Sequence, residues 1–177
     1  MFLINIFDYR LLILILIGFV AVKTWDIYKR RRNLKKLREN RIYFSYILAK
    51  VLKETNILDK ASLTTKDAEM ILDVLNEFPD LDEVKKIRSV FKIYKAYVAE
   101  HPSVHADPRT MREKIIIPIM RKMIEMFTII DPELYKLVEK EEAMYIKKKV
   151  KQRVYISTIL EKVIEKSLSR YEAPQAQ

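Results

Sequence analysis

Residues 11–22 read Leu-Leu-Ile-Leu-Ile-Leu-Ile-Gly-Phe-Val-Ala-Val, and a run of four basic residues begins at Lys29. An apolar run beside a block of cations is typical of a helix that crosses a bilayer. Residues 9–28 would cover about 30 Å as a helix, the thickness of a hydrocarbon core. We therefore predict a single transmembrane anchor over residues 1–28, carried by Leu11, Leu12, Ile13, Leu14, Ile15, Leu16, Ile17, Phe19, Val20 and Trp25.

Three alternatives to a spanning helix stay open for this stretch. A cleaved signal peptide has an apolar region of similar length, but it needs a basic start and a small-x-small cleavage site. Here Asp8 and Arg10 cancel, and residues 20–23, Val-Ala-Val-Lys, form a poor cleavage site. The other two alternatives are a helix buried in a core and a helix lying in the membrane interface.

Most of the excess positive charge follows the apolar run. Residues 29–41 hold a single acid, Glu39, against the basic residues Lys29, Arg30, Arg31, Arg32, Lys35, Lys36, Arg38 and Arg41. Basic flanks of this kind stay on the cytoplasmic side, so we expect an outside N-terminus and a cytoplasmic body, with the opposite orientation still open. The same cations could hold anionic lipid headgroups.

Composition predicts an all-α fold. The chain has 177 residues, a net charge of +10, 33% charged residues, one glycine and no cysteine. A single glycine disfavours tight hairpins, and the absence of cysteine excludes disulfides and thiolate metal ligands. We expect a transmembrane helix extended by a basic juxtamembrane helix over residues 29–56, a bundle of about four helices with a long C-terminal helix over residues 57–171, and a disordered tail at residues 172–177.

Helix signals subdivide this expected body. No proline or glycine interrupts residues 22–56, which favours one rod over residues 9–55, about 70 Å long, with Asn56 at its C-terminal end. Thr64 or Thr65 is expected to cap the next helix, which Pro79 ends. Residues 80–83, Asp-Leu-Asp-Glu, have capping-box spacing and open another helix.

Two later helices are strongly apolar. Pro118 is expected to kink the helix over residues 108–130. A final helix could run unbroken from Asp131 to Tyr171, and its apolar stripe must pack back on the body or onto another subunit. We take these side chains as candidates for partner contact, with core packing as the alternative: Met120, Met123, Phe127, Ile156, Leu160, Val163, Ile164 and Leu168.

No catalytic motif, metal site or cofactor site emerges. One glycine cannot build a phosphate-binding loop. His101 and His105 are spaced like helical metal ligands, but Pro102 and Pro108 make their segment a loop. We therefore expect no enzyme activity and no cofactor, with a helical enzyme using these histidines as a minor alternative.

Two functional hypotheses remain. The first is a membrane-anchored scaffold or adaptor, in which apolar helix faces bind other subunits of a membrane complex or a second copy of the chain. The second is a binder of anionic lipid or nucleic acid, in which residues 29–41 and 147–153 form one basic surface. The bilayer is an expected partner in both, and nucleic acid is the partner we expect least.

Overall fold

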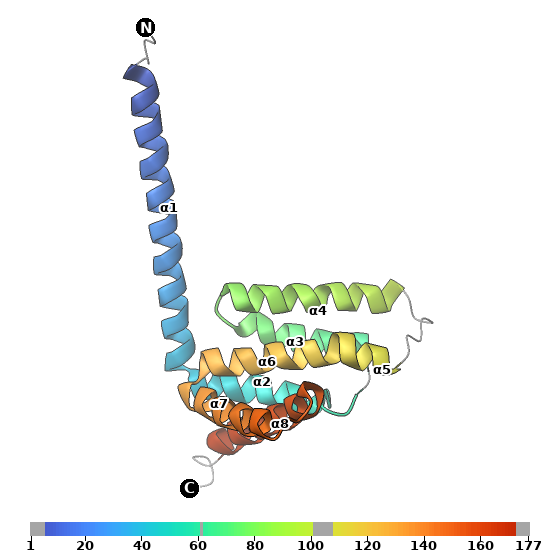
Figure 1. Ribbon diagram of the computed structural model, residues 1–177. Helices are drawn as coiled ribbons and strands as arrows, with labels where there is room; N and C mark the ends of the chain where they lie inside the picture. The colour runs from blue at the N-terminus through green and yellow to red at the C-terminus, as the bar shows by residue number, and fades with distance from the viewer. Residues whose placement is uncertain (1–5, 61, 101–107, 173–177) are drawn as a thin grey trace.

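The computed structural model describes residues 6–60, 62–100 and 108–172. All regular elements in these ranges are helices, so the predicted all-α fold with a long apolar N-terminal helix and a helical bundle is confirmed (Figure 1). The elements are α1 (Ile6–Glu39), α2 (Arg41–Glu54), α3 (Thr65–Glu77), α4 (Asp82–Glu100), α5 (Pro108–Met111), the π-helical turn η1 (Arg112–Ile116), α6 (Ile117–Ile130), α7 (Pro132–Lys147) and α8 (Gln152–Glu172).

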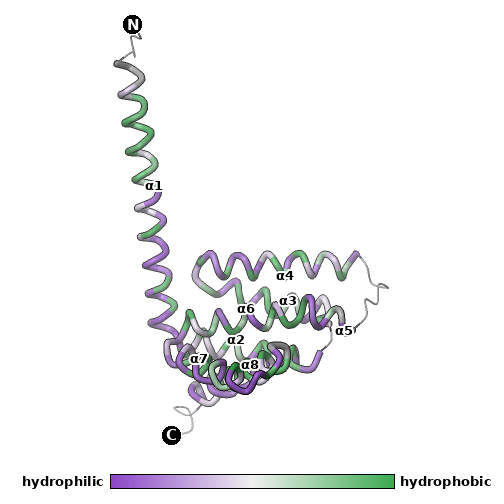
Figure 2. Tube along the Cα trace, viewed as in Figure 1, coloured by the Kyte–Doolittle hydropathy of each residue, from purple (hydrophilic) through white to green (hydrophobic). Residues whose placement is uncertain are grey.

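Helix α1 projects from the body, whereas the other helices pack together. Its outer half is hydrophobic and its inner half hydrophilic (Figure 2). Helices α4, α3 and α6 extend away from the base of α1 in a direction that crosses it steeply (Figure 1). The body therefore extends to one side of the α1 axis.

The predicted rod over residues 9–55 is wrong, because the helix breaks at Asn40. This residue has φ −107° and ψ 29°, and α2 starts afresh at Arg41. The break has an energetic reason: Phe44, Leu48 and Leu52 on α2 are buried in the core. A straight rod would carry these side chains away from the body and leave them in water, whereas burial of each stabilises the fold by about 1.5–3 kcal/mol.

Helix α2 ends one residue earlier than expected, with Thr55 as its C-cap, and Asn56 follows in the turn. Its φ of 47° lies in the left-handed region, which asparagine tolerates better than most residues. The N–H of Asn56 donates to the Lys53 carbonyl, and that of Ile57 donates to the Leu52 carbonyl. These two hydrogen bonds form a Schellman motif, which satisfies the last carbonyls of the helix.

Helices α3 and α4 form a hairpin. Thr64 caps α3 as expected, in a capping box with Asp67. Pro79 follows the helix end, also as expected. The role predicted for Asp80 is wrong, because α4 begins only at Asp82; Asp80 instead forms ion pairs with cations of α1 and α4.

Helical structure continues on both sides of Pro118, and the kink expected at this residue stays a prediction. Directly before it, η1 widens the helix by one residue, and the N–H of Ile117 donates to the Arg112 carbonyl five residues back. Proline removes a hydrogen-bond donor and crowds the preceding turn, so a wider turn accommodates it. Arg112, in that turn, donates to the Leu58 and Lys60 carbonyls at 2.6 and 2.8 Å.

The predicted unbroken C-terminal helix is also wrong, since it divides into α7 and α8. Lys149 takes a left-handed φ of 53° in the turn between them. The turn lets α8 fold back against α2, α6 and α7. The apolar stripe of α8 is thereby buried inside the chain, which was the first of the two outcomes expected for it.

Candidate functional site

The residues predicted to anchor the chain in a membrane lie on α1, and all of them are exposed. Helix α1 is long and apolar enough to cross a membrane, and none of its apolar window is buried. These exposed side chains are Leu11, Leu12, Ile13, Leu14, Ile15, Leu16, Ile17, Phe19, Val20 and Trp25. A helix with apolar side chains on every side requires an apolar environment around it.

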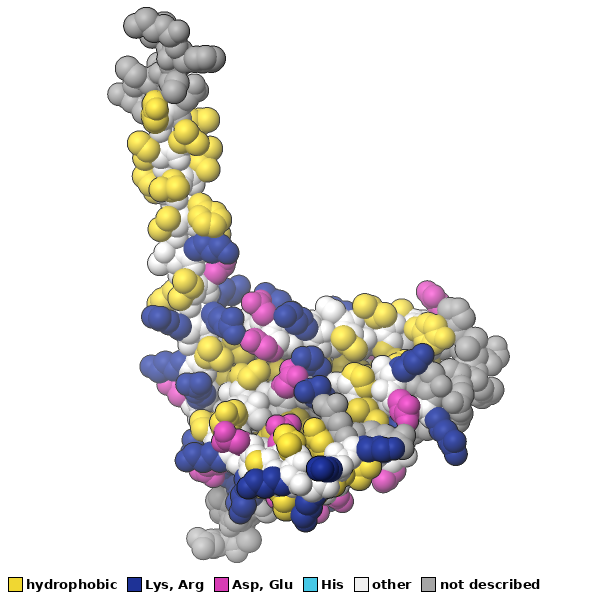
Figure 3. All heavy atoms as spheres, viewed as in Figure 1, with side chains coloured by type: hydrophobic (Ala, Val, Ile, Leu, Met, Phe, Trp, Pro, Cys, Tyr) yellow, Lys and Arg dark blue, Asp and Glu magenta, His cyan; other side chains and the backbone are white. Residues whose placement is uncertain are grey.

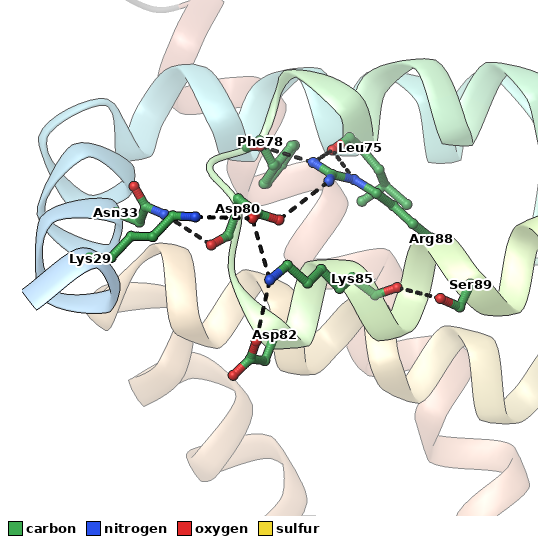
Figure 4. Close-up of polar contacts among 9 residues, drawn as sticks. All are labelled: Lys29, Asn33, Leu75, Phe78, Asp80, Asp82, Lys85, Arg88 and Ser89. Atoms are coloured by element: carbon green, nitrogen blue, oxygen red, sulfur yellow. Dashed lines mark hydrogen bonds and ion pairs between the residues drawn. The ribbon is translucent and has the colours of Figure 1, made fainter. Parts of the chain in front are cut away.

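The base of α1 is joined to the turn between α3 and α4. Asn33 donates from Nδ2 to the Asp80 carbonyl at 2.9 Å, and Lys29 pairs with the Asp80 carboxylate at 3.8 Å (Figure 4). Arg30 donates to Glu83 at 2.7 Å. Leu37, one turn further along, has 0% of its surface exposed. We call this set of contacts the joint.

The turn that receives α1 is itself held firmly. Arg88 on α4 donates to the Leu75 carbonyl from Nε and Nη2, at 3.0 and 2.7 Å, and to the Phe78 carbonyl at 3.0 Å (Figure 4). These carbonyls lie at the end of α3, where the Leu75 carbonyl also accepts a hydrogen bond from the Phe78 N–H at 3.3 Å. Lys85 adds an ion pair to Asp80 at 3.3 Å. The joint therefore connects α1 to an ordered part of the body.

The basic block of residues 29–41 is divided between two roles. Four of its cations pair with acids: Lys29 and Arg30 at the joint, Lys35 with Glu39, and Arg41 with Glu133. The remaining four are exposed and form no ion pair with any residue that the structure describes: Arg31, Arg32, Lys36 and Arg38. Only the second group stays fully available to a negatively charged surface.

The two predicted basic clusters do not form one surface. Arg41 lies 3.9 Å from Glu133, at the start of α7, whereas Lys147 lies at the end of that helix. A helix of 16 residues is about 24 Å long. The clusters therefore lie near opposite ends of α7, which is against a single continuous track for nucleic acid.

The apolar residues predicted to contact partners are mainly core residues. Helices α6 and α8 pack against each other and against α2. Those that are buried within the chain are Met120, Met123, Phe127, Ile156, Leu160, Val163 and Ile164, and Leu168 is partly buried against them. This burial agrees with the core-packing alternative, whereas contact of these residues with a partner stays a prediction.

An open apolar groove between α4 and the η1–α6 segment was not predicted. Its volume is about 660 Å³. Val90, Ile93 and Tyr97 form its α4 side, and Ile93 is 71% exposed. Figure 3 shows hydrophobic side chains on this part of the body, with basic side chains around them. The sequence does hold a second row of apolar residues on α4, beside the row that contains the buried Ile87 and Phe91, but spacing alone does not show that this second row stays uncovered.

Shifted pKa values identify groups that stabilise the fold. Burial raises the pKa of Asp67, but hydrogen bonds from Lys60 and Thr64 outweigh burial and hold that pKa below its usual value. Burial raises the pKa of Tyr94, whose hydroxyl accepts from the Leu63 N–H at 3.0 Å and donates to the Leu63 carbonyl at 2.9 Å. Asp67 and Tyr94 both hold the connector before α3 in place. Each forms its hydrogen bonds with residues of that connector.

Within the described ranges, no group of three His, Cys, Asp or Glu side chains could hold a metal ion. His101 and His105, the pair considered for an enzyme or metal site, lie outside the described residues. The geometry thus offers an exposed apolar helix, a joint and a groove as the features to explain. No protein-family description, curated protein or solved structure matches the chain, so these three features carry the functional argument.

Proposed function

We propose that the protein is a membrane-anchored helical adaptor, which holds partner subunits of a membrane complex, or a second copy of itself, at a defined position. Helix α1 spans the bilayer once in this proposal. The exposed cations after it favour an outside N-terminus and a cytoplasmic body. An adaptor requires no active site, and we expect none.

The joint is the observation that carries this proposal. A simple anchor needs only a linker, because a loose chain keeps a domain at the membrane equally well. Here Leu37 is buried in the body and Asn33 donates to the α3–α4 turn. Such contacts would give the body a fixed orientation relative to the bilayer. A fixed orientation is useful when the adaptor must bind one partner within the bilayer and another beside its body at the same time.

Affinity purification of the tagged full-length protein in a gentle detergent tests the proposal. We expect defined membrane-protein subunits in a constant ratio, retained at high salt because apolar contacts are not screened. The Leu37→Ala variant should capture less partner, whereas Lys35→Ala, at an exposed position of the same helix, should behave as the wild type. Recovery of only lipid or nucleic acid, removed by salt, would show that the adaptor proposal is wrong.

A further inference from the structure

The α4–α6 groove combines an apolar lining with unpaired positive charge. Its basic residues are Lys86, Lys114, Arg121 and Lys122, and its one acid, Glu125, is held by Lys122 at 2.6 Å. Lys86, Lys114 and Arg121 form no ion pair with any described residue. Three cations without counterions beside exposed aliphatic side chains fit a ligand that is both apolar and anionic.

The position of the groove relative to α1 favours a membrane lipid as this ligand. The contacts of Lys29 and Asn33 with Asp80 place the start of α4 beside the first turns that follow Tyr28. Asn33 lies about 7.5 Å along the helix from Tyr28, whereas the headgroup layer of a bilayer is about 5–8 Å deep. Helix α4 then extends away from α1 across its axis (Figure 1). The groove therefore lies beside the bilayer surface when α1 spans the bilayer.

The size of the groove suits a small amphiphile. Ligand sites in proteins typically enclose about 300–1,000 Å³ and have a mainly apolar lining with a few convergent polar groups. The groove, at about 660 Å³, lies within this range. Its α4 side, from Lys86 to Tyr97, is about 17 Å long, which is enough for much of an acyl chain.

We propose that this groove binds an anionic phospholipid from the adjacent leaflet. An acyl chain lies against Val90 and Ile93, and the phosphate is held by Lys86, Lys114 and Arg121. Basic pockets at the cytoplasmic side of membrane proteins hold anionic headgroups by the same attraction. The proposal rests on the membrane anchoring described under the proposed function, and it adds a ligand and a site.

Reconstitution of the full-length protein in nanodiscs with equal amounts of phosphatidylcholine and phosphatidylglycerol tests this site. The protein is released into detergent, and native mass spectrometry counts the retained lipids. We expect one retained phosphatidylglycerol, preferred about a hundredfold, because each nearby cation contributes about a factor of five to binding.

Matched variants locate the bound lipid. The triple variant Lys86→Glu, Lys114→Glu and Arg121→Glu should abolish the preference, whereas Lys136→Glu, Lys140→Glu and Lys147→Glu, with the same change of net charge, should keep it. Ile93→Glu should release the lipid. Ile146→Glu, at another exposed apolar position, should not.

Four outcomes would overturn the inference. Equal retention of both lipids would contradict charge selection, and unchanged retention in the groove variants would place the lipid elsewhere, around α1. If a co-purified protein helix occupied the groove and no lipid were retained, the groove would be a protein-docking site instead. Failure of the protein to enter nanodiscs would overturn the membrane anchoring as well, so the two proposals fail in distinguishable ways.

Discussion

Replacing Leu37 by alanine should loosen the joint far more than removing its ion pairs. Leu37 has 0% of its surface exposed, and truncation of a fully buried leucine costs about 2–5 kcal/mol. Arg30 and Glu83 have side chains 55% and 33% exposed, and such surface pairs contribute about 0–1 kcal/mol. Lys29 and Asp80 are further apart and similarly exposed, so their contribution falls at the lower end of that range.

Distance measurements between two spin labels can test this order, and the lack of cysteine in the chain makes labelling specific. Labels at Thr24→Cys on α1 and Lys140→Cys on α7 are both exposed and report on the angle between anchor and body. We expect a narrow distance distribution in the wild type and in Arg30→Ala, and a broad one in Leu37→Ala. Added salt should change little. If salt or Arg30→Ala broadened the distribution as much as Leu37→Ala, the joint would be electrostatic and the reasoning wrong.

Three further substitutions test local parts of the fold by chemical denaturation. Tyr94→Phe should lower the free energy of unfolding by about 1–3 kcal/mol, because it leaves two buried Leu63 backbone groups without a partner; Tyr135→Phe, at an exposed site, serves as the control. Lys149→Gly should raise the free energy of unfolding by up to about 1 kcal/mol, because relief of the left-handed strain, about 1–2 kcal/mol, exceeds the entropy cost of glycine, about 0.5–1 kcal/mol; a decrease would show that the lysine side chain stabilises the turn. The lowered pKa of Asp67 stabilises the fold above the pKa of this group in the unfolded chain, and the stabilisation is lost as pH falls through the folded pKa. Asp67→Asn should therefore flatten the pH dependence of stability below about pH 5, and an unchanged acid profile would contradict this.

Helix type and several helix ends were predictable because they depend on neighbouring residues. Thr64 as a cap and a helix end beside Asn56 are set by side chains within a few positions. The breaks at Asn40 and Lys149 were not predictable in this way. No proline or glycine marks them, and each exists because the helix after it buries an apolar stripe against distant parts of the chain.

The same limit explains why the candidate site was only half predicted. The apolar run of α1 is recognisable because every side of the helix is apolar. An apolar stripe such as that of α8 indicates that one face of the helix is buried. Periodicity does not show whether that face packs against the same chain or against a partner. The groove escaped prediction for the converse reason: Val90 and Ile93 resemble ordinary helix residues until the placement of α6 leaves them uncovered.

In the proposed arrangement, with α1 across the bilayer, we expect the free cations of the basic block to contribute unequally to membrane binding. Arg32 lies about 6 Å along α1 from Tyr28, whereas Lys36 lies about 12 Å away. With a screening length of about 8 Å at physiological salt, only Arg31 and Arg32 interact fully with headgroups, at about 1 kcal/mol each. For the proposed spanning helix, we expect the ten Leu, Ile, Val and Phe residues among residues 11–22 to contribute about 3–6 kcal/mol to insertion, and salt does not screen that contribution. High salt should therefore leave the protein in the membrane while it removes the lipid preference of the groove, so washing at increasing salt separates anchoring from lipid recognition.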